Sequence, residues 1–400
     1  MQLNDNLGHL TYCTNIHAGE TWAEIFDGIR KHLPAVKAEF SPNVPLGLGL
    51  RLSAAAGESL CDPEIFGKFE VFLKEGDYYI FTLNGFPYGT FHGQPIKEGA
   101  YRPDWSDPAR LTYTNTLAEH LVKWLPDGME GSISTVPGTY KSWVAGSDGP
   151  KIISAIGDNI VRHVAHLVGI KAATDKTINL ALEPEPCCLI ETIEETVSFF
   201  QEHLFCDHAV SLLSELTGLN IDEAVAAMQT HVGVCYDVCH AAVEFENAQE
   251  SLDALKEAGI KISKFQLSSA LRIASVGEDT KAQLDAMNEP VYLHQVVENR
   301  NGDITRFSDL PDALAIIDAA QGAEWRIHFH VPIFLEEMQG LGTTQQFLKE
   351  VLAIHKASPL TEQLEVETYT WDVLPEKYRR SGLSASIARE LAWVRDELVS

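Results

Sequence analysis

Four apolar runs of this chain end in an acid or a histidine, and this arrangement strongly limits how the chain can fold. The runs span residues 178–185, 233–240, 326–330 and 364–368. Continuous apolar runs are typical of parallel strands that are buried on both faces. Because the C-terminal ends of such strands open on one mouth, we expect the side chains at these ends to form one site.

Strand-like and helical segments alternate along most of the chain. Asp62-Pro63 and Asp107-Pro108 each combine an acidic cap with an early proline, as helix starts do. Repeated strand–helix units predict an α/β fold with a parallel sheet, here a (β/α)8 TIM barrel. A doubly wound open sheet is the alternative, disfavoured because no glycine-rich fingerprint follows an early strand. The eight expected strands lie at residues 10–15, 46–52, 79–85, 131–138, 178–185, 233–240, 262–269 and 364–368.

One segment departs from this alternation. Residues 291–297 and 303–307 flank an Asn-Gly pair at 301–302, which predicts a β-hairpin on a tight turn. We expect a hairpin insertion at about 288–310, before the last strand, and we expect residues 326–330 to lie as an accessory segment over the mouth. No low-complexity linker divides the chain, so residues 1–400 are expected to form one barrel domain.

The charge balance narrows the choice of partners. Among 400 residues, 30 Lys and Arg face 57 Asp and Glu, which gives a formal net charge of -27. Such an acidic surface repels phosphate backbones, so we expect no nucleic-acid partner. The first residues lack a basic region followed by an apolar core, and no apolar run approaches the ~20 residues that span a bilayer. We therefore expect no membrane insertion and a cytoplasmic location, and the oligomeric state stays open.

The seven cysteines do not have the spacing of a disulfide framework. We therefore expect reduced thiols, as in cytosolic proteins. Cys235 and Cys239 flank Asp237 at even spacing. They are interpreted as small buried core residues rather than zinc ligands, because no second cysteine pair completes a site.

The ends of the strands supply a set of candidate metal ligands. Carboxylate oxygen and imidazole nitrogen together suit Mn²⁺, Mg²⁺, Zn²⁺ or Fe²⁺, so a divalent metal ion is expected. Asp237 has the alternative of capping the next turn, and His240 that of a core histidine bonded to a carbonyl. The expected ligands are Glu183, Asp237, His240, Gln266, His328, His330 and Glu367.

Strand alternation cannot decide between the acids in two pairs, because residues two apart in a strand point to the same face. Glu185 points to the same side as Glu183, and Glu365 to the same side as Glu367. We favour Glu183 because it adjoins the apolar run, and Glu367 because it lies nearer the C-terminal end of its strand. For the histidines at 328 and 330, one ligand is as plausible as two.

The order of these residues resembles that of the xylose-isomerase-like TIM barrels, which include sugar isomerases, ketose 3-epimerases and nucleases of the endonuclease IV type. The resemblance implies a metal held by acids of the fifth, sixth and eighth strands with a histidine three residues after the second acid. Gln266 departs from the usual ligand of the seventh strand. More narrowly, residues 85–93, 101–105, 131–138 and 328–332 resemble the EboE family of metabolite-traffic proteins. That resemblance implies a role in a small-molecule pathway linked to metabolite export.

The chemistry of such a site favours an isomerase or epimerase. A metal bound to adjacent carbonyl and hydroxyl oxygens of a sugar or cyclitol acidifies the carbon-bound proton between them, and Glu183 and Glu367 are the expected catalytic pair that moves it. We expect residues 86–105 and the segment around 328–334 to meet over the mouth as a lid. Residues expected to contact a small polyol, sugar or cyclitol are Asn84, Phe86, Tyr88, Trp105 and Trp371.

Two other functions compete with this one. A non-catalytic metabolite-binding protein would use the same mouth, and Gln266 favours it. A metal-dependent hydrolase of the endonuclease IV type would need a basic groove, which the net charge of -27 disfavours. Arg51, Lys141 and Lys264 are candidate phosphate ligands, although we favour solvated or ion-paired roles for all three.

Overall fold

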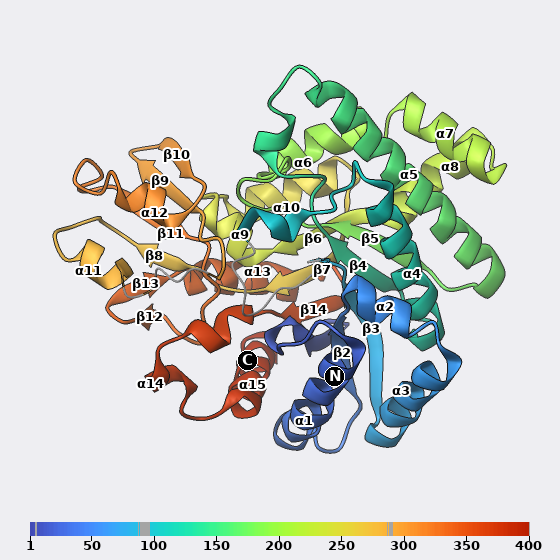
Figure 1. The fold of residues 1–400 in the computed structure, drawn as a ribbon, viewed down its shortest axis with the longest axis horizontal. Helices are drawn as coiled ribbons and strands as arrows, with labels where there is room; N and C mark the ends of the chain where they lie inside the picture. Colours follow the sequence, from blue (N-terminus) through green and yellow to red (C-terminus); the bar gives the residue numbers. More distant parts are fainter. Residues whose placement is uncertain (5, 87, 89–96, 286, 288–290, 400) are drawn as a thin grey trace.

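Eight parallel strands form the centre of the protein, as the apolar runs predict. The computed structural model describes residues 1–4, 6–86, 88, 97–285, 287 and 291–399. The strands pair in the order β1-β14-β7-β6-β5-β4-β3-β2, and a parallel bridge between Cys13 and Gly49 joins the two ends. The sheet is therefore a closed barrel, which confirms the predicted (β/α)8 fold (Figure 1). Its strands are β1 (His9–Tyr12), β2 (Leu46–Arg51), β3 (Tyr78–Asn84), β4 (Gly131–Thr135), β5 (Ile178–Leu182), β6 (Val232–Asp237), β7 (Lys261–Leu267) and β14 (Gln363–Val366).

The helices follow the strands along the chain and cover the outside of the barrel (Figure 1). Asp62 and Asp107 cap α3 and α4 by accepting backbone N–H groups, as their sequences predict. Their side chains satisfy donors that the first helical turn leaves unpaired. The longer helices are α1 (Trp22–Phe40), α2 (Ala54–Ser59), α3 (Pro63–Gly76), α4 (Pro108–Trp124), α5 (Gly149–Thr174), α6 (Ile193–Phe199), α7 (Asp207–Thr217), α8 (Ile221–His231), α9 (Val238–Val243), α10 (Ala248–Glu257), α13 (Gln345–Ala357) and α15 (Leu383–Val399).

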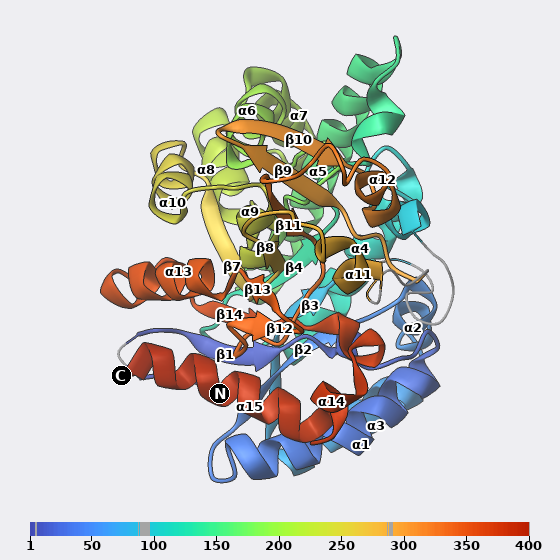
Figure 2. The same ribbon diagram turned by 90° about the vertical axis from the view of Figure 1, so that its left-hand side faces the viewer.

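Further helical segments follow several of the strands, continue α6 and lie in the insertion. The site draws on three of them, η1, η2 and η5. They are η1 (Thr14–Ile16), η2 (Lys97–Tyr101), η3 (Lys141–Val144), η4 (Phe200–Leu204), α11 (Thr280–Asp285), α12 (Leu310–Leu314), η5 (Tyr369–Val373) and α14 (Glu376–Arg379). At the other end of the chain, α15 packs beside α1 and so brings the last helix back to the first (Figure 2).

The insertion between β7 and β14 contains the predicted hairpin within a larger sheet. β9 and β10 pair antiparallel, and the turn residues Asn301 and Gly302 have φ values of 56° and 98°. Positive φ at both central residues is the geometry that an Asn-Gly turn provides. Four more short strands join the hairpin, and this accessory sheet lies to one side of the barrel (Figures 1 and 2). Its order is β10 (Asp303–Phe307), β9 (Val296–Arg300), β11 (Glu324–Ile327), β8 (Leu271–Ile273), β13 (Leu341–Thr343) and β12 (Glu337–Met338).

Strand register sets which side chains face each other inside the barrel. Asp237 of β6 pairs with Gln266 of β7, which in turn pairs with Glu365 of β14. Because alternate side chains point to the same face, Lys264 shares the inward face with Gln266. Glu367 follows the last residue of β14, so it lies beyond Glu365 toward the C-terminal mouth.

Candidate metal centre

Three carboxylates from three strands meet at the C-terminal mouth of the barrel. Glu183 follows β5, Asp237 ends β6 and Glu367 follows β14. One oxygen of each lies within 4.8 Å of the others, and all three side chains are buried. The structure thus brings together the three acids that the strand ends predict.

Asp237 has two roles in this arrangement. Its Oδ1 accepts the backbone N–H of His240 at 3.0 Å and the hydroxyl of Ser268 at 2.7 Å, which caps α9. Its Oδ2 is buried and has no hydrogen-bond partner among the described residues. The capping role considered from sequence therefore coexists with an oxygen that is free to bind a cation.

Glu185 and Glu365, which the sequence could not separate from their neighbours, have different environments. Glu365 forms an ion pair with Lys264 deep in the barrel, and neither side chain is exposed. Glu185 lies at the mouth, where its Oε1 accepts the hydroxyl of Tyr101 at 2.7 Å. An oxygen of Glu185 also lies within 4.8 Å of ring nitrogens of His240 and His328. Glu365 is thus paired with Lys264, while Glu185 belongs to the candidate metal site.

Burial and mutual repulsion oppose ionisation of these acids. Burial, together with Glu367 and Asp237, raises the pKa of Glu183 well above its usual value. Burial also raises the pKa of Glu185 to about 8 and that of Glu367 to about 8. Carboxylates that share a dry site favour either a proton or a cation between them. Within the described residues, Glu183 Oε2 and Glu185 Oε2 also lack a hydrogen-bond partner, so the donor set fits a divalent ion.

Glu367 is held by two side-chain amides, one from η1 after the first strand and one from the end of β3. Its Oε1 accepts the Nδ2 group of Asn15 at 2.7 Å and that of Asn84 at 3.4 Å. Asn84 in turn accepts the backbone N–H of Phe86 at 3.2 Å. The predicted contact residue Asn84 therefore orients a carboxylate of the site.

Three imidazoles cover the carboxylates. His240 lies in the first turn of α9, and His328 and His330 lie on the segment after β11. His240 Nε2 is 3.0 Å from His328 Nε2, which is 3.2 Å from His330 Nε2. Burial lowers the pKa of His240, lowers that of His328 well below its usual value, and lowers that of His330 to about 4. All three imidazoles are thus neutral at pH 7 and able to bind a metal.

Gln266 lies inside the barrel beside Asp237 in the strand register. Its Oε1 is 4.0 Å from the sulfur of Cys235, and its buried Nε2 has no partner among the described residues. An amide carbonyl is a weaker ligand than a carboxylate or an imidazole. Its role as a metal ligand remains a proposal.

A small cavity opens above the carboxylates. Its volume is ≈ 50 Å³, and aromatic side chains form much of its wall. Phe86 lines it as predicted and stacks on Tyr101, with ring centroids 5.6 Å apart. Its lining residues are Asn15, Phe86, Lys97, Ala100, Tyr101, Glu183, Glu185, His240, Tyr292, Leu293, His328, Glu367 and Tyr369.

The other predicted aromatic contacts do not line this cavity. Trp105 is fully buried, and its indole N–H donates to Thr135 Oγ1 at 3.0 Å. Tyr88 packs edge-on against Tyr113 of α4, and Trp371 is buried in the core. Of the predicted lid, residues 87 and 89–96 lie outside the described residues.

Several lining residues were missed from sequence. Tyr101 belongs to the predicted aromatic loop, but nothing in the spacing distinguishes it from the tryptophan at 105. Tyr292 precedes the hairpin, and Tyr369 follows the eighth strand. A tyrosine two residues after a strand-end acid is a usable signal for Tyr369, because it stays at the same mouth.

The three basic residues considered for phosphate have other partners. Lys141 binds Glu191 and Glu195, and Lys264 binds Glu365. Arg51 donates to the backbone carbonyl of Gly19 and to Glu20. These contacts agree with the ion-paired roles favoured from sequence.

Fold and site together define a class: a closed (β/α)8 barrel with buried carboxylates and imidazoles at the C-terminal ends of its strands. No protein-family model matches the chain, and no curated protein matches it. Neither comparison supports the resemblance to the EboE family. Among the described residues, no helix has both the length and the apolar character needed to cross a membrane.

Several solved structures are similar to the chain at low identity. One is described as the probable 3-DHS dehydratase AsbF of petrobactin synthesis from Bacillus anthracis, with 10% identity, a TM-score of 0.47 and coverage of 96% of this chain and 97% of that one. An L-ribulose 3-epimerase has 12% identity, a TM-score of 0.44 and coverage of 98% and 94%. The IolI protein, solved with a bound zinc atom, has 12% identity, a TM-score of 0.45 and coverage of 98% of both chains. The fold assignment rests on the barrel itself.

Proposed function

We propose that this protein is a metal-dependent isomerase or epimerase that acts on a small polyol, sugar or cyclitol. The observation that carries the proposal is the meeting of Glu183, Asp237 and Glu367 at one buried point. Three acids confined in this way favour a divalent cation, which neutralises their charge. The metal identity stays open among Mn²⁺, Mg²⁺, Zn²⁺ and Fe²⁺.

A bound divalent ion would polarise adjacent carbonyl and hydroxyl oxygens of the substrate and acidify the proton between them. Glu183 and Glu367 are the residues that would accept and return that proton. Glu367 lies buried at the base of the cavity, where a carboxyl group can both take up and release a proton. Asn15 and Asn84 would keep the Glu367 carboxylate in one orientation during this transfer.

The walls of the cavity favour a ring that has both apolar and polar faces. Phe86, Tyr101 and Tyr369 offer aromatic surface, while Glu183 and Glu367 lie at the base. Aromatic faces pack against the C–H face of a sugar, and its hydroxyls then point at the polar groups. A cavity of ≈ 50 Å³ holds an ion with a few waters, so binding of a whole sugar requires the wall to move.

Hydrogen exchange at carbon tests this proposal without knowledge of the product. Protein loaded with Mn²⁺ or Mg²⁺ is incubated in D₂O with a panel of aldoses, ketoses and ketocyclitols, and loss of the α-proton signal is followed by NMR. We expect exchange with at least one compound, and at least a hundredfold slower exchange in Glu183→Gln and Glu367→Gln. Glu244→Gln is the matched control, because Glu244 is equally buried but pairs with Arg306 outside the site.

A non-catalytic metabolite-binding protein is the second candidate. Gln266 at the seventh-strand ligand position favours it, since it weakens the expected ligand set. Calorimetric binding of a polyol to metal-loaded protein, with no exchange of any carbon-bound proton, would establish this alternative and reject the isomerase.

The remaining functional proposals rest on sequence. A role linked to metabolite export is supported by the EboE-like segments alone. A cytoplasmic location is supported by the seven cysteines, whose spacing is not that of a disulfide framework. The net charge of -27 supports the absence of a nucleic-acid partner and argues against an endonuclease IV-like hydrolase.

A further inference from the structure

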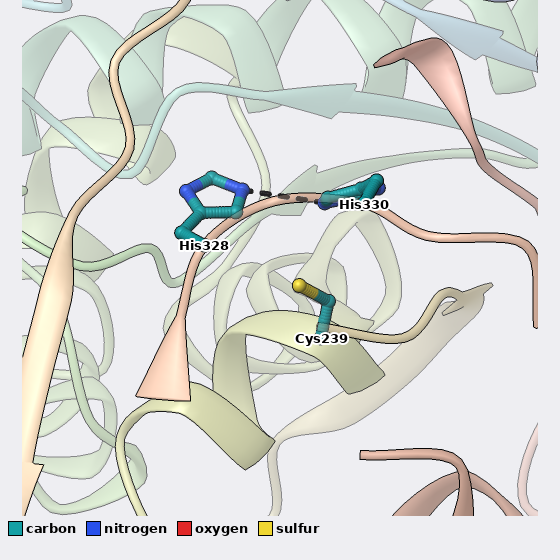
Figure 3. Close-up of side chains that lie close together, drawn as sticks. All are labelled: Cys239, His328 and His330. Atoms are coloured by element: carbon teal, nitrogen blue, oxygen red, sulfur yellow. Dashed lines mark hydrogen bonds between the residues drawn. The ribbon is translucent and has the colours of Figure 1, made fainter. Parts of the chain in front are cut away.

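A thiol lies beside two of the imidazoles, next to the carboxylate site. Cys239 belongs to α9, and its sulfur points toward the space between His328 and His330 (Figure 3). The sulfur and one ring nitrogen of each histidine lie within 4.8 Å of one another. All three residues are buried, with exposed fractions of 0%, 3% and 0%.

The hydrogen bonds of both histidines fix where their protons are. His328 Nδ1 is 2.8 Å from Gln295 Oε1, and His330 Nδ1 is 3.0 Å from the backbone oxygen of Glu367. The Gln295 amide is oriented by its Nε2 group, which donates to the Tyr101 hydroxyl and to a backbone carbonyl. Because both acceptors carry no proton, each Nδ1 must donate.

Neutral rings with the proton on Nδ1 have their lone pairs on Nε2. The two Nε2 atoms of His328 and His330 are 3.2 Å apart, and the Nε2 of His240 is 3.0 Å from that of His328. Lone pairs at this distance repel unless a proton or a cation lies between them. Nitrogen lone pairs that converge in this way are ready ligands for a metal cation.

The second observation concerns the thiol itself. The backbone N–H of Cys239 donates to Ser268 at 2.9 Å, which holds the first turn of α9 in place. Around the side chain, Val243, Ala270 and Val297 form a small apolar cluster with it. The sulfur thus has apolar neighbours in that cluster, and the converging imidazole nitrogens lie on its other side.

We propose that Cys239, His328 and His330 form a second metal site, selective for zinc-type ions and adjoining the carboxylate site. Sulfur and imidazole nitrogen are ligands of borderline and soft ions such as Zn²⁺, whereas carboxylate oxygens also suit Mg²⁺ and Mn²⁺. Binding replaces the thiol proton with the metal ion, so one proton is released to solvent for each ion bound at the sulfur. Cys239 is buried in an apolar cluster, as expected from sequence, and the proposal adds a ligand role to it.

Cobalt substitution tests this site through its absorption spectrum. The full-length chain, freed of metal with a chelator, is titrated with Co²⁺ under reducing conditions. We expect an intense thiolate-to-cobalt charge-transfer band in the near ultraviolet, with the intensity of one cobalt–thiolate bond per chain. Cys239→Ala should remove the band and weaken Zn²⁺ binding at least tenfold, while Mn²⁺ binding stays within twofold of the parent.

Two variants serve as controls. Cys235→Ala removes a thiol that is equally buried and flanks Asp237 on the other side, and it should keep the band. Glu183→Gln should keep the band while it loses Mn²⁺ binding, which separates failure of this site from failure of the proposed function. If the alanine variant does not fold, Cys239→Ser carries the same test, because an alcohol gives no such band. A parent spectrum without the band, or a band that survives in the Cys239 variants, overturns the proposal.

Discussion

Lys264 of β7 and Glu365 of β14 form an ion pair inside the barrel, and neither side chain is exposed to solvent. Removing one partner of such a pair leaves an uncompensated buried charge, which typically costs about 3–5 kcal/mol. We therefore expect Lys264→Met to lower the free energy of unfolding by this amount in urea titrations at pH 7. The double variant Lys264→Met/Glu365→Leu should recover most of the loss, and a single variant as stable as the parent would contradict the prediction.

Gly49 is needed because of its neighbours in the barrel interior. A Cβ at this position would lie 1.7 Å from Glu365 Oε1 and 2.7 Å from the backbone oxygen of Tyr12, which cannot easily move. We expect Gly49→Ala to destabilise the protein by about 1–3 kcal/mol, as overpacking does. Gly67→Ala in α3 is the control, since nothing lies within 4 Å of its added methyl group, and it should be neutral or slightly stabilising.

Asp237→Asn separates metal binding from folding. Asparagine can still cap α9 through its carbonyl oxygen, whereas Asp237→Ala would also lose the cap, at a cost of about 1 kcal/mol. We expect the asparagine variant to keep its stability without metal and to bind Mn²⁺ at least tenfold more weakly by calorimetry. If its affinity equals that of the parent, Asp237 is not a ligand.

Glu390 of α15 makes stability depend on pH. Its Oε1 accepts the backbone N–H of Ile333 at 3.1 Å and the hydroxyl of Thr368 at 2.7 Å. Burial raises its pKa from 4.5 to about 7, so the folded state binds the proton more tightly than the unfolded chain. The resulting stabilisation is complete below pH 4.5 and is lost as the pH rises through 7.

Replacing Glu390 with glutamine removes this dependence, because a glutamine oxygen can accept both hydrogen bonds. Relative to the parent, Glu390→Gln should become more stable between pH 5 and pH 8, by at most about 3 kcal/mol at 1.4 kcal/mol per pKa unit. Urea titrations at both pH values give the difference. The exposed Glu70→Gln serves as control, and the same pH profile in both variants would refute the assignment.

Trp105 and Phe86 should respond differently to truncation. Trp105 is fully buried and bonded to Thr135, so Trp105→Ala should cost about 3–5 kcal/mol of stability. Phe86 lines the cavity and is half-buried, so Phe86→Ala should change stability less and weaken binding of a polyol. Thermal melts and calorimetry distinguish the two effects, and the reverse pattern would place Trp105 in the binding site.

The barrel and its acids could be predicted because their signals are local. β5 and β6 are largely apolar runs that lead into an acid, and Glu183, Asp237 and Glu367 all lie at the C-terminal ends of strands. Strand alternation could not distinguish Glu365 from Glu367 as the ligand, since both side chains point inward. The choice depends on Lys264, which lies 101 residues away and takes only the deeper acid.

The accessory sheet and the thiol were harder to predict, for different physical reasons. β12 and β13 contain two and three residues, too few for an alternating pattern to be recognised. Cys239 lies on a short helix and has the sequence pattern of a core residue. Its proposed ligand role depends on His328, which belongs to a different segment of the chain. Contacts of this kind, between segments far apart in the sequence, cannot be predicted from composition or residue spacing.

The atoms that orient His240 and His330 belong to the main chain. Their Nδ1 groups donate to the carbonyls of Pro184 and Glu367, so main-chain acceptors select the tautomer. A point mutation at either acceptor position changes the side chain and leaves the carbonyl where it is. The orientation of these two rings is thus insensitive to side-chain substitution at the acceptor positions. The orientation of the His328 ring, in contrast, depends on the side chain of a single residue, Gln295.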